Sequence, residues 1–385
     1  MSRIIPYGRQ HITEEDIQSV VNVLRSDFLT QGPKVAEFEE AFAGYIGSKY
    51  AVAVSSGTAA LHLSASVLGV QSGVKVITSP ITFAATANCI EYCGGDIVLA
   101  DIDPDTYLLD IKHVEALLGK APIGTYKGII PVDLTGNPVN MEAYRKLADK
   151  YNVWLIEDAC HAPGAYFIDL KGIPQKCGNG TFSDLAIFSF HPVKHIASGE
   201  GGMITTNNSD LYEKLLMLRT HGITKQPNRL NEDHGGWYYE MQMLGYNYRL
   251  TDFQAALALS QLKRADEGLN KRSDIANIYD RAFSDYSIVR QTRDDFKSNA
   301  YHLYIIEVEN RKELYDHLRT KGIFAQVHYI PLYYMPYYQH KGWKKKDYPH
   351  AEGYYSKCLS LPMYPSLTES DQQYVIESVL EFVGK

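Results

Sequence analysis

A lysine that could act as a nucleophile, Lys194, lies within residues 188–203, between an apolar run and a glycine-rich turn. A lysine amine at such a junction in an α/β core is partly removed from water. This lowers its pKa and lets it form a Schiff base with an aldehyde. The glycines that follow allow the backbone to approach a bulky group. Because lysines more often extend from a strand end to water, the assignment depends on the neighbouring motifs.

A carboxylate that could assist such chemistry, Asp158, follows the apolar residues 153–156. The run is typical of a buried parallel strand, and ligands of open α/β sheets bind at the carboxyl ends of such strands. Pyridoxal phosphate needs a carboxylate that keeps its pyridine nitrogen protonated, and Asp158 fits that requirement. The alternative interpretation is that Asp158 caps the following helix.

A candidate phosphate site lies in residues 51–69, where a short strand enters a Ser-Ser-Gly-Thr turn and then a run of helix formers. Free backbone amides and the dipole at such a helix start bind a phosphate, and Thr58 adds a hydroxyl. The same turn is also an ordinary helix cap. Neither a Gly-x-Gly-x-x-Gly nor a Gly-x-x-x-x-Gly-Lys-Ser/Thr motif accompanies it, which disfavours a dinucleotide fold or a P-loop.

With these three segments in order, the chain resembles the fold-type I pyridoxal-phosphate enzymes, and in particular the DegT/DnrJ/EryC1/StrS family of nucleotide-sugar aminotransferases. The resemblance runs nearly end to end and includes residues 29–33, 79–88, 218–222, 245–252 and 326–331. It implies an α/β fold with a large domain, residues 1–255, built on a mainly parallel seven-stranded sheet flanked by helices. A smaller α/β domain is expected over residues 256–385, with residues 1–14 packing on it.

The resemblance also implies roles for individual residues. Lys194 is expected to bind pyridoxal phosphate as a Schiff base and to move protons, and Asp158 to contact the pyridine nitrogen. Phe83 would stack on the cofactor ring. Asn247 would reach the cofactor of the neighbouring subunit, which implies a homodimer with shared active sites. For His161, contact with the cofactor oxygen and a more distant hydrogen-bonding role both remain open. The complete cofactor set implied is Gly57, Thr58, Ala59, Phe83, Asp158, His161, Ser189, Lys194 and Asn247.

The substrate positions implied are Tyr7, His328, Tyr329 and Arg249. Several segments are most similar to the branch of the family that serves pseudaminic acid biosynthesis. These are residues 4–10, 28–32, 79–83, 190–194 and 237–240. That branch implies ping-pong transfer of the amino group of L-glutamate to C4 of a UDP-linked 4-keto-6-deoxy-N-acetylhexosamine. Amination of another UDP-, dTDP- or GDP-linked keto sugar is the alternative.

Two other classes of function share this fold. Sugar dehydratases of the family replace the lysine by histidine, and some bind a cluster through cysteines. Lys194 and the dispersed cysteines weigh against that class. A non-catalytic sensor would not need Lys194, Asp158, Phe83, Ser189 and Asn247 together, so the intact set disfavours it.

Composition agrees with a globular enzyme, since 45% of the 385 residues are hydrophobic and 22% charged. A net charge of -7 argues against non-specific nucleic-acid binding. No apolar run reaches membrane-spanning length and no signal peptide is evident, so a cytoplasmic location without a membrane partner is expected. The five cysteines have no metal-binding spacing, and residues 101–112 lack the glycine and glutamate of a calcium loop. No metal site is therefore predicted.

The elements that must position these residues follow from local signals. A capping box at residues 13–16 predicts an amphipathic opening helix, and strands alternating with helices over residues 50–210 favour a parallel sheet covered on both faces. A long helical passage is expected from about residue 250 to 283. Strands of the smaller domain are predicted at residues 302–309 and 324–329, and a last helix from Thr368.

The segment of residues 329–348 is crowded with tyrosines and carries three lysines, at 344–346. Its rings could stack on a sugar or uracil, and its lysines could pair with a pyrophosphate. The alternative is a surface loop with a solvated lysine run.

Overall fold

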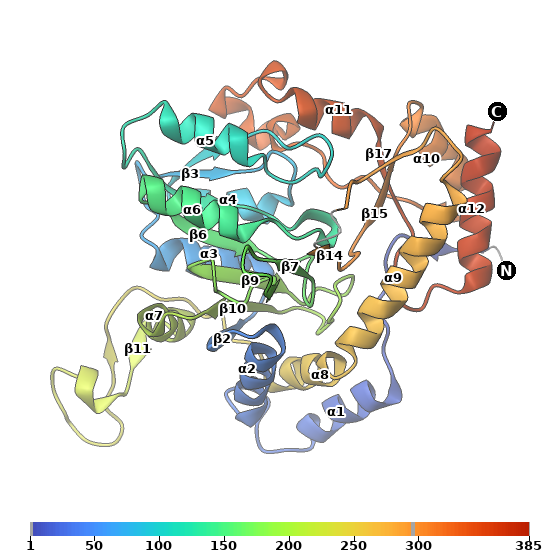
Figure 1. Ribbon diagram of the computed structural model, residues 1–385. Coiled ribbons are helices and arrows are strands. Elements are labelled where there is room, and N and C mark those ends of the chain that lie inside the picture. The colour runs from blue at the N-terminus through green and yellow to red at the C-terminus, as the bar shows by residue number, and fades with distance from the viewer. Residues whose placement is uncertain (1–2, 294–296, 385) are drawn as a thin grey trace.

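A seven-stranded sheet forms the centre of the computed structural model, which describes residues 3–293 and 297–384 (Figure 1). Its strand order is β2, β10, β9, β6, β5, β3, β4. Strand β10 runs antiparallel to β2 and β9, and the remaining pairs are parallel. The carboxyl ends of six strands therefore meet at one edge, and the predicted mainly parallel seven-stranded sheet is confirmed. The strands are β2 Tyr50–Val54, β3 Lys75–Thr78, β4 Asp96–Leu99, β5 Tyr126–Ile130, β6 Trp154–Asp158, β9 Leu185–Ser189 and β10 Gly202–Thr206.

These strands are continuous apolar runs because helices cover both faces of the sheet, so successive side chains on either face are buried (Figure 1). Helix α3 contacts α4 and α7, and α5 contacts α6. The helices are α3 Gly57–Val67, α4 Ala84–Tyr92, α5 Ile111–Gly119, α6 Met141–Tyr151 and α7 Ser209–Arg219. The first of them begins at the predicted Ser-Ser-Gly-Thr turn and ends before Gly69, whose φ is +80°.

The chain opens with α1 (Glu14–Leu24), and the predicted capping box is present, because Thr13 and Asp16 exchange side-chain and backbone hydrogen bonds. Helix α2 (Pro33–Ile46) follows, and both helices contact α8 (Asp252–Leu262). The predicted helical passage is divided, since α9 (Ala265–Ala282) starts after a bend at Arg264. The bend lets the Arg264 guanidinium form an ion pair with buried Asp16 and donate to His11 O at 2.7 Å.

A second core surrounds a three-stranded antiparallel sheet near the C-terminus, and it includes buried Tyr279, Ile306 and Val379. The sheet comprises β13 Val289–Arg290, β15 Tyr304–Glu307 and β17 Cys358–Leu361. Helices α9, α10 (Arg311–Thr320) and α12 (Glu369–Val383) contribute buried residues to this core, whereas α11 (Pro349–Lys357) buries Ala351 and Tyr354 in the core of the large sheet. Thr368 caps α12 as predicted. The predicted strand at residues 324–329 is shorter, because β16 (Ile323–Phe324) pairs only with β1 (Ile5–Pro6) before the chain turns toward the large sheet.

The N-terminal strand β1 thus lies against the second core, while the domain boundary after residue 255 stays a prediction. Short elements complete the fold: β7 Tyr166–Ile168, β8 Pro174–Lys176, β14 Lys297–Ser298, β11 Ile223–Thr224, β12 Glu240–Met241, and the 3₁₀ turns η1 Leu134–Gly136, η2 Pro227–Arg229, η3 Leu332–Tyr334, η4 Pro336–Lys341 and η5 Lys345–Asp347. The chain after β11 projects from the body (Figure 1). Among the described residues, no helix is both long and apolar enough to cross a membrane.

Candidate active site

A cavity of about 480 Å³ opens at the carboxyl edge of the large sheet, where β6 and β9 end and α3 and α4 begin. Ligands of α/β sheets bind at this edge because loops there can converge without disturbing the core. Ten of the predicted site residues line it: Tyr7, Gly57, Thr58, Phe83, Asp158, His161, Ser189, Lys194, His328 and Tyr329.

Asp158 stands at the end of β6 with both carboxylate oxygens engaged. Oδ2 accepts a hydrogen bond from Thr86 Oγ1 at 2.8 Å, and Oδ1 accepts the Cys160 N–H at 3.3 Å. Burial raises the pKa of Asp158, whereas these hydrogen bonds and the nearby Lys194 charge lower it. The carboxylate is therefore held in one orientation at the cavity floor, which is what a ring N–H donor would require.

Lys194 comes from the turn between β9 and β10. Its Nζ lies 3.5 Å from His302 Nε2. Desolvation lowers the pKa of the Lys194 ammonium, while Cys160 and Asp158 oppose the shift and buried Arg272 adds to it. A lowered pKa increases the share of neutral amine, which is the nucleophilic form.

The start of α3 forms a cradle beside this lysine. Ser56 caps the helix, and its Oγ accepts the Ala59 N–H at 3.0 Å. A Cβ added at Gly57 would lie 2.9 Å from Ser189 Cβ, so only glycine fits against β9 here. Thr58 and Ser189, which both carry hydroxyls, line the cavity next to the helix N-terminus. This donor set suits a phosphate, since amides and hydroxyls donate hydrogen bonds to its oxygens.

Phe83 immediately precedes α4, and its side chain is 61% exposed although it lines the cavity. Its ring centroid lies 6.1 Å from that of Tyr329. A large apolar ring left uncovered beside a polar cavity fits the flat ring of pyridoxal phosphate. The cavity thus offers Phe83 for the face of the ring, Asp158 for the ring nitrogen and the α3 cradle for the phosphate.

Histidines also line the cavity. His161 Nδ1 accepts the Thr135 N–H at 3.3 Å, so Nε2 carries the proton and donates to Tyr329 Oη at 3.1 Å. His302 packs on His161 with ring centroids 4.1 Å apart. Burial, aided by the Lys194 charge, lowers the pKa of both histidines, so they are neutral. His328 Nδ1 lies 2.9 Å from Ser360 Oγ.

Three contacts were not predicted: Thr86 and Cys160 on Asp158, and His302 on Lys194. Thr86 lies within residues 79–88, one of the segments that resemble the family, so this motif could have pointed to Thr86 as a site residue. His302 begins the predicted strand at residues 302–309, and nothing in that strand pattern marks it as a cavity residue.

Three predicted residues do not reach the cavity of this chain. Ala59 lies inside the first turn of α3, where its amide bonds Ser56. Asn247 is exposed and pairs with Thr220. Arg249 lines a separate hollow of about 280 Å³ that also includes Arg219. Asn247 and Arg249 therefore lie outside the cavity of this chain, and their predicted roles stay predictions.

The tyrosine-rich segment mainly packs against the large sheet's helices rather than entering the cavity. Tyr333 and Tyr348 are buried and stacked, with ring centroids 5.0 Å apart. Tyr338 donates to Asn88 of α4. The lysines at 344–346 are exposed, as expected for a solvated run. Of the tyrosines in this segment, Tyr329 lines the cavity.

The sheet, the cavity at its edge, and the lysine and aspartate that line it define a fold-type I pyridoxal-phosphate-dependent transferase. The model of the DegT/DnrJ/EryC1/StrS aminotransferase family matches residues 10–380, and the chain belongs to this family. The predicted family and fold class are confirmed. The chain is thus an enzyme of the sugar aminotransferase class.

Three relatives illustrate the similarity. The UDP-4-amino-4,6-dideoxy-N-acetyl-beta-L-altrosamine transaminase of Campylobacter jejuni is 38% identical over 390 residues, covering 99% of this chain and 98% of that protein. Helicobacter pylori PseC, an aminotransferase involved in the biosynthesis of pseudoaminic acid, is 33% identical with a TM-score of 0.89, over 99% and 100% of the two chains. Spr1654 from Streptococcus pneumoniae, solved in its PMP form, is 30% identical with a TM-score of 0.89, over 98% and 100%.

Proposed function

We propose that this enzyme uses pyridoxal phosphate to transfer the amino group of L-glutamate to C4 of a UDP-linked 4-keto-6-deoxy-N-acetylhexosamine, in two half-reactions. The observation that carries the proposal is the oriented Asp158 carboxylate in the same cavity as Lys194. The likeness to the Campylobacter jejuni transaminase and to PseC supports the sugar substrate. Amination of a different nucleotide-linked keto sugar is the alternative.

When bound, the cofactor supplies a ring that accepts the electron pair released at a substrate carbon. Asp158 would accept a hydrogen bond from the ring nitrogen and favour its positive charge. The Lys194 amine would hold the cofactor through its aldehyde carbon and, when released from it, would take the proton from glutamate Cα and return a proton to the sugar carbon. Transfer by a positioned group of this kind contributes about 10²–10⁴-fold. The α3 cradle holds the phosphate and Phe83 covers the ring.

We further propose a homodimer in which Asn247 and Arg249 complete the partner's cavity. The absence of both residues from the lining of this chain's own cavity supports the proposal. So do the large apolar side chains left exposed around β12, which include Met241 and Leu244, the latter 78% exposed. Covering such side chains is what an interface would do.

An absorbance experiment tests the function. We expect purified protein with pyridoxal phosphate to show the visible band of a lysine-bound cofactor, and L-glutamate to convert it to the near-ultraviolet band of the pyridoxamine form. A panel of UDP-, dTDP- and GDP-linked keto sugars is then added singly. Recovery of the visible band with the UDP-linked 4-keto sugar alone supports the proposal. Recovery with another sugar selects the alternative, and a band that glutamate never changes contradicts transamination.

A further inference from the structure

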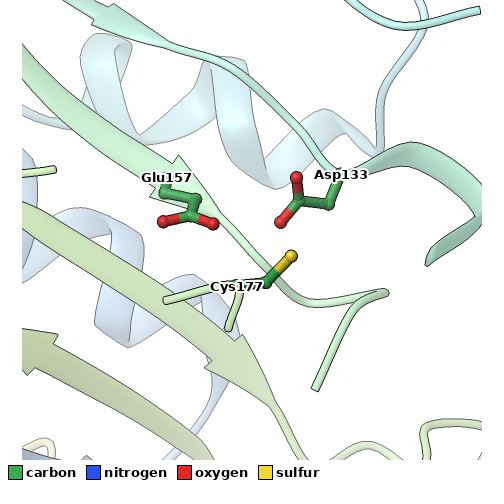
Figure 2. A group of neighbouring side chains, drawn as sticks. All are labelled: Asp133, Glu157 and Cys177. Atoms are coloured by element: carbon green, nitrogen blue, oxygen red, sulfur yellow. The ribbon is translucent and has the colours of Figure 1, made fainter. Parts of the chain in front are cut away.

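Three buried side chains, Asp133, Glu157 and Cys177, cluster beside β6 (Figure 2). Asp133 follows β5, Glu157 precedes Asp158 in β6, and Cys177 follows β8. Neighbouring residues of a strand point to opposite faces, so Glu157 points away from the cavity that Asp158 lines. The three are 0%, 3% and 1% exposed, and their donor atoms lie within 4.8 Å of one another.

Each carboxyl group already accepts backbone hydrogen bonds on one side. Asp133 Oδ1 accepts the Val139 N–H at 2.7 Å, and Glu157 Oε1 accepts the Gly178 N–H at 3.0 Å. Within the described residues, Asp133 Oδ2 has no hydrogen-bond partner although it is fully buried. Figure 2 shows the Asp133 carboxyl group and the Cys177 sulfur directed into the same small space as Glu157.

Two ionised carboxylates would be strongly unfavourable here. Moving a charge out of water is costly, and like charges at this separation add to the cost. The other charged or titratable groups that act on the cluster are Asp158, near Asp133, and Lys297, near Cys177. Neither carboxyl group has a lysine or arginine ion pair within the described part of the chain. One added proton removes one charge and supplies the donor that Asp133 Oδ2 lacks.

We propose that Asp133 and Glu157 share one proton at neutral pH, and that this carboxylic acid–carboxylate pair is a positioning device for Asp158. Burial raises the pKa of Asp133 to about 7 and raises the pKa of Glu157 well above its ordinary range, in agreement with the geometry. The Cys177 thiol, whose pKa burial also raises, stays neutral beside the pair.

The link to Asp158 runs through the main chain. The Asp133 N–H donates to Asp158 O at 3.1 Å, and the Asp158 N–H donates to Pro131 O at 2.9 Å. On the opposite face of the strand, the side chains of Asp133 and Glu157 join the same two segments a second time. Loss of their mutual hydrogen bond would therefore free the end of β6 that presents Asp158. The positioning step rests on the proposed function of Asp158, whereas the shared proton does not.

Infrared spectroscopy of the purified full-length protein tests the shared proton. At about pH 8 exposed carboxyl groups, with reference pKa values of about 4, are ionised. We expect wild type to show the C=O stretch of a protonated carboxylic acid, and both Glu157→Gln and Asp133→Asn to lose it, since an amide then supplies the donor. Glu309→Gln, at an exposed side chain, is the matched control and keeps the band.

The shared proton is overturned if wild type lacks the band, or if the band survives both substitutions. It is equally overturned if the purified protein carries a stoichiometric metal ion that is lost in Glu157→Gln, because the three side chains would then be metal ligands.

Cofactor affinity tests the positioning step separately. We expect Glu157→Leu to raise the Kd for pyridoxal phosphate about tenfold, because Asp133 Oδ2 loses its donor, while Glu157→Gln stays within about twofold. Asp133→Ala is the second disrupting variant if Glu157→Leu does not fold. Wild-type affinity in a folded disrupting variant overturns the positioning role. If the wild-type protein binds no cofactor, the proposed function is wrong. The infrared band then still tests whether Asp133 and Glu157 share a proton.

Discussion

Thr86 Oγ1 donates to Asp158 Oδ2 over 2.8 Å and so joins the first turn of α4 to the end of β6. The same helix follows directly on Phe83. One short element therefore sets both the exposed ring on one side of the cavity and the direction of the carboxylate at its floor. A shift of α4 would disturb two of the proposed cofactor contacts together.

Substitution Thr86→Val should weaken cofactor binding. Burial raises the pKa of Asp158, and the Thr86 hydroxyl is one of the hydrogen bonds that oppose this shift. Removing a hydrogen bond to a charged group costs about 1.5–3 kcal/mol, which corresponds to about a tenfold or larger rise in the Kd for pyridoxal phosphate. Fluorescence titration of the apo protein measures it. Thr86→Ser keeps the hydroxyl and should bind as wild type, and equal affinities of the two variants would contradict this role.

Substitution Lys194→Ala should abolish turnover, because the proposed covalent link and proton transfer both use this amine. We expect a loss of at least about 10²-fold in kcat, from the proton-transfer contribution alone. Lys214→Ala, at an exposed lysine of α7, is the control and should keep full activity. A Lys194→Ala variant that retains a tenth of wild-type turnover would refute the assignment.

Phe83 offers a test that separates binding from folding. Because its ring is exposed in the absence of a ligand, Phe83→Ala should change the stability of the apo protein by no more than about 0.5 kcal/mol. Loss of the stacking surface should nevertheless raise the Kd for pyridoxal phosphate about tenfold. Phe38→Ala, at a fully buried ring, should lose about 3–5 kcal/mol of stability instead. Urea denaturation and cofactor titration distinguish the two, and unchanged affinity in Phe83→Ala would exclude stacking.

The parts of the site that could be predicted from sequence are those with a local signal. Asp158 ends a continuous apolar run, and Gly57 follows a strand and opens a helix, so both positions follow from strand and helix patterns. The contact between Thr86 and Asp158 joins residues 72 positions apart, and no periodicity encodes such a pairing. The same holds for His302 beside Lys194, which are 108 positions apart.

The tyrosine-rich segment shows why composition alone could not decide its role. An aromatic ring is equally suited to a sugar and to a protein surface. Tyr338 is buried because α4 supplies Asn88 as its partner, 250 positions away. Its neighbour Tyr337, in the same 3₁₀ turn, is exposed. Only packing against distant elements explains why Tyr338 is buried and Tyr337 is exposed.

The buried histidines predict a pH dependence of stability. Burial lowers the pKa of His328 from 6.5 to about 3, so the folded protein holds it neutral. Below about pH 6.5 the unfolded chain binds the extra proton, so this contribution is complete above that pH and is lost as the pH falls toward 3. The slope for one histidine is about 1.4 kcal/mol per pH unit.

Urea denaturation at about pH 7.5 and about pH 5.5, on either side of the reference histidine pKa, measures this slope. His328→Gln should lose less stability between the two than wild type, by about 1 kcal/mol. The exposed His234→Gln is the control and should match wild type. Identical pH dependence of His328→Gln and wild type would show that His328 is not held neutral by burial.

Complementation between two inactive variants tests the shared active site. Asn247 is exposed in a single chain, so Asn247→Asp should fold normally, but in a dimer it would bring a negative charge to the partner's cofactor phosphate and abolish activity. Lys194→Ala should be inactive through the other side of the same cavity. In a heterodimer of these two variants, one cavity combines Lys194 from one chain with Asn247 from the other and is intact. We expect purified heterodimers, separated by two affinity tags, to regain about half of wild-type activity, one intact site of two.

The matched control pairs Lys194→Ala with Asp158→Ala. Both residues line the cavity of one chain, so each cavity of that heterodimer carries one defect and should stay inactive. Suppose that the first heterodimer regains activity and the second stays inactive. Asn247 then acts across the interface, whereas Lys194 and Asp158 act within one chain. Inactivity of both heterodimers would mean that Asn247 serves the cavity of its own chain, and the proposal of a shared cavity would then be wrong.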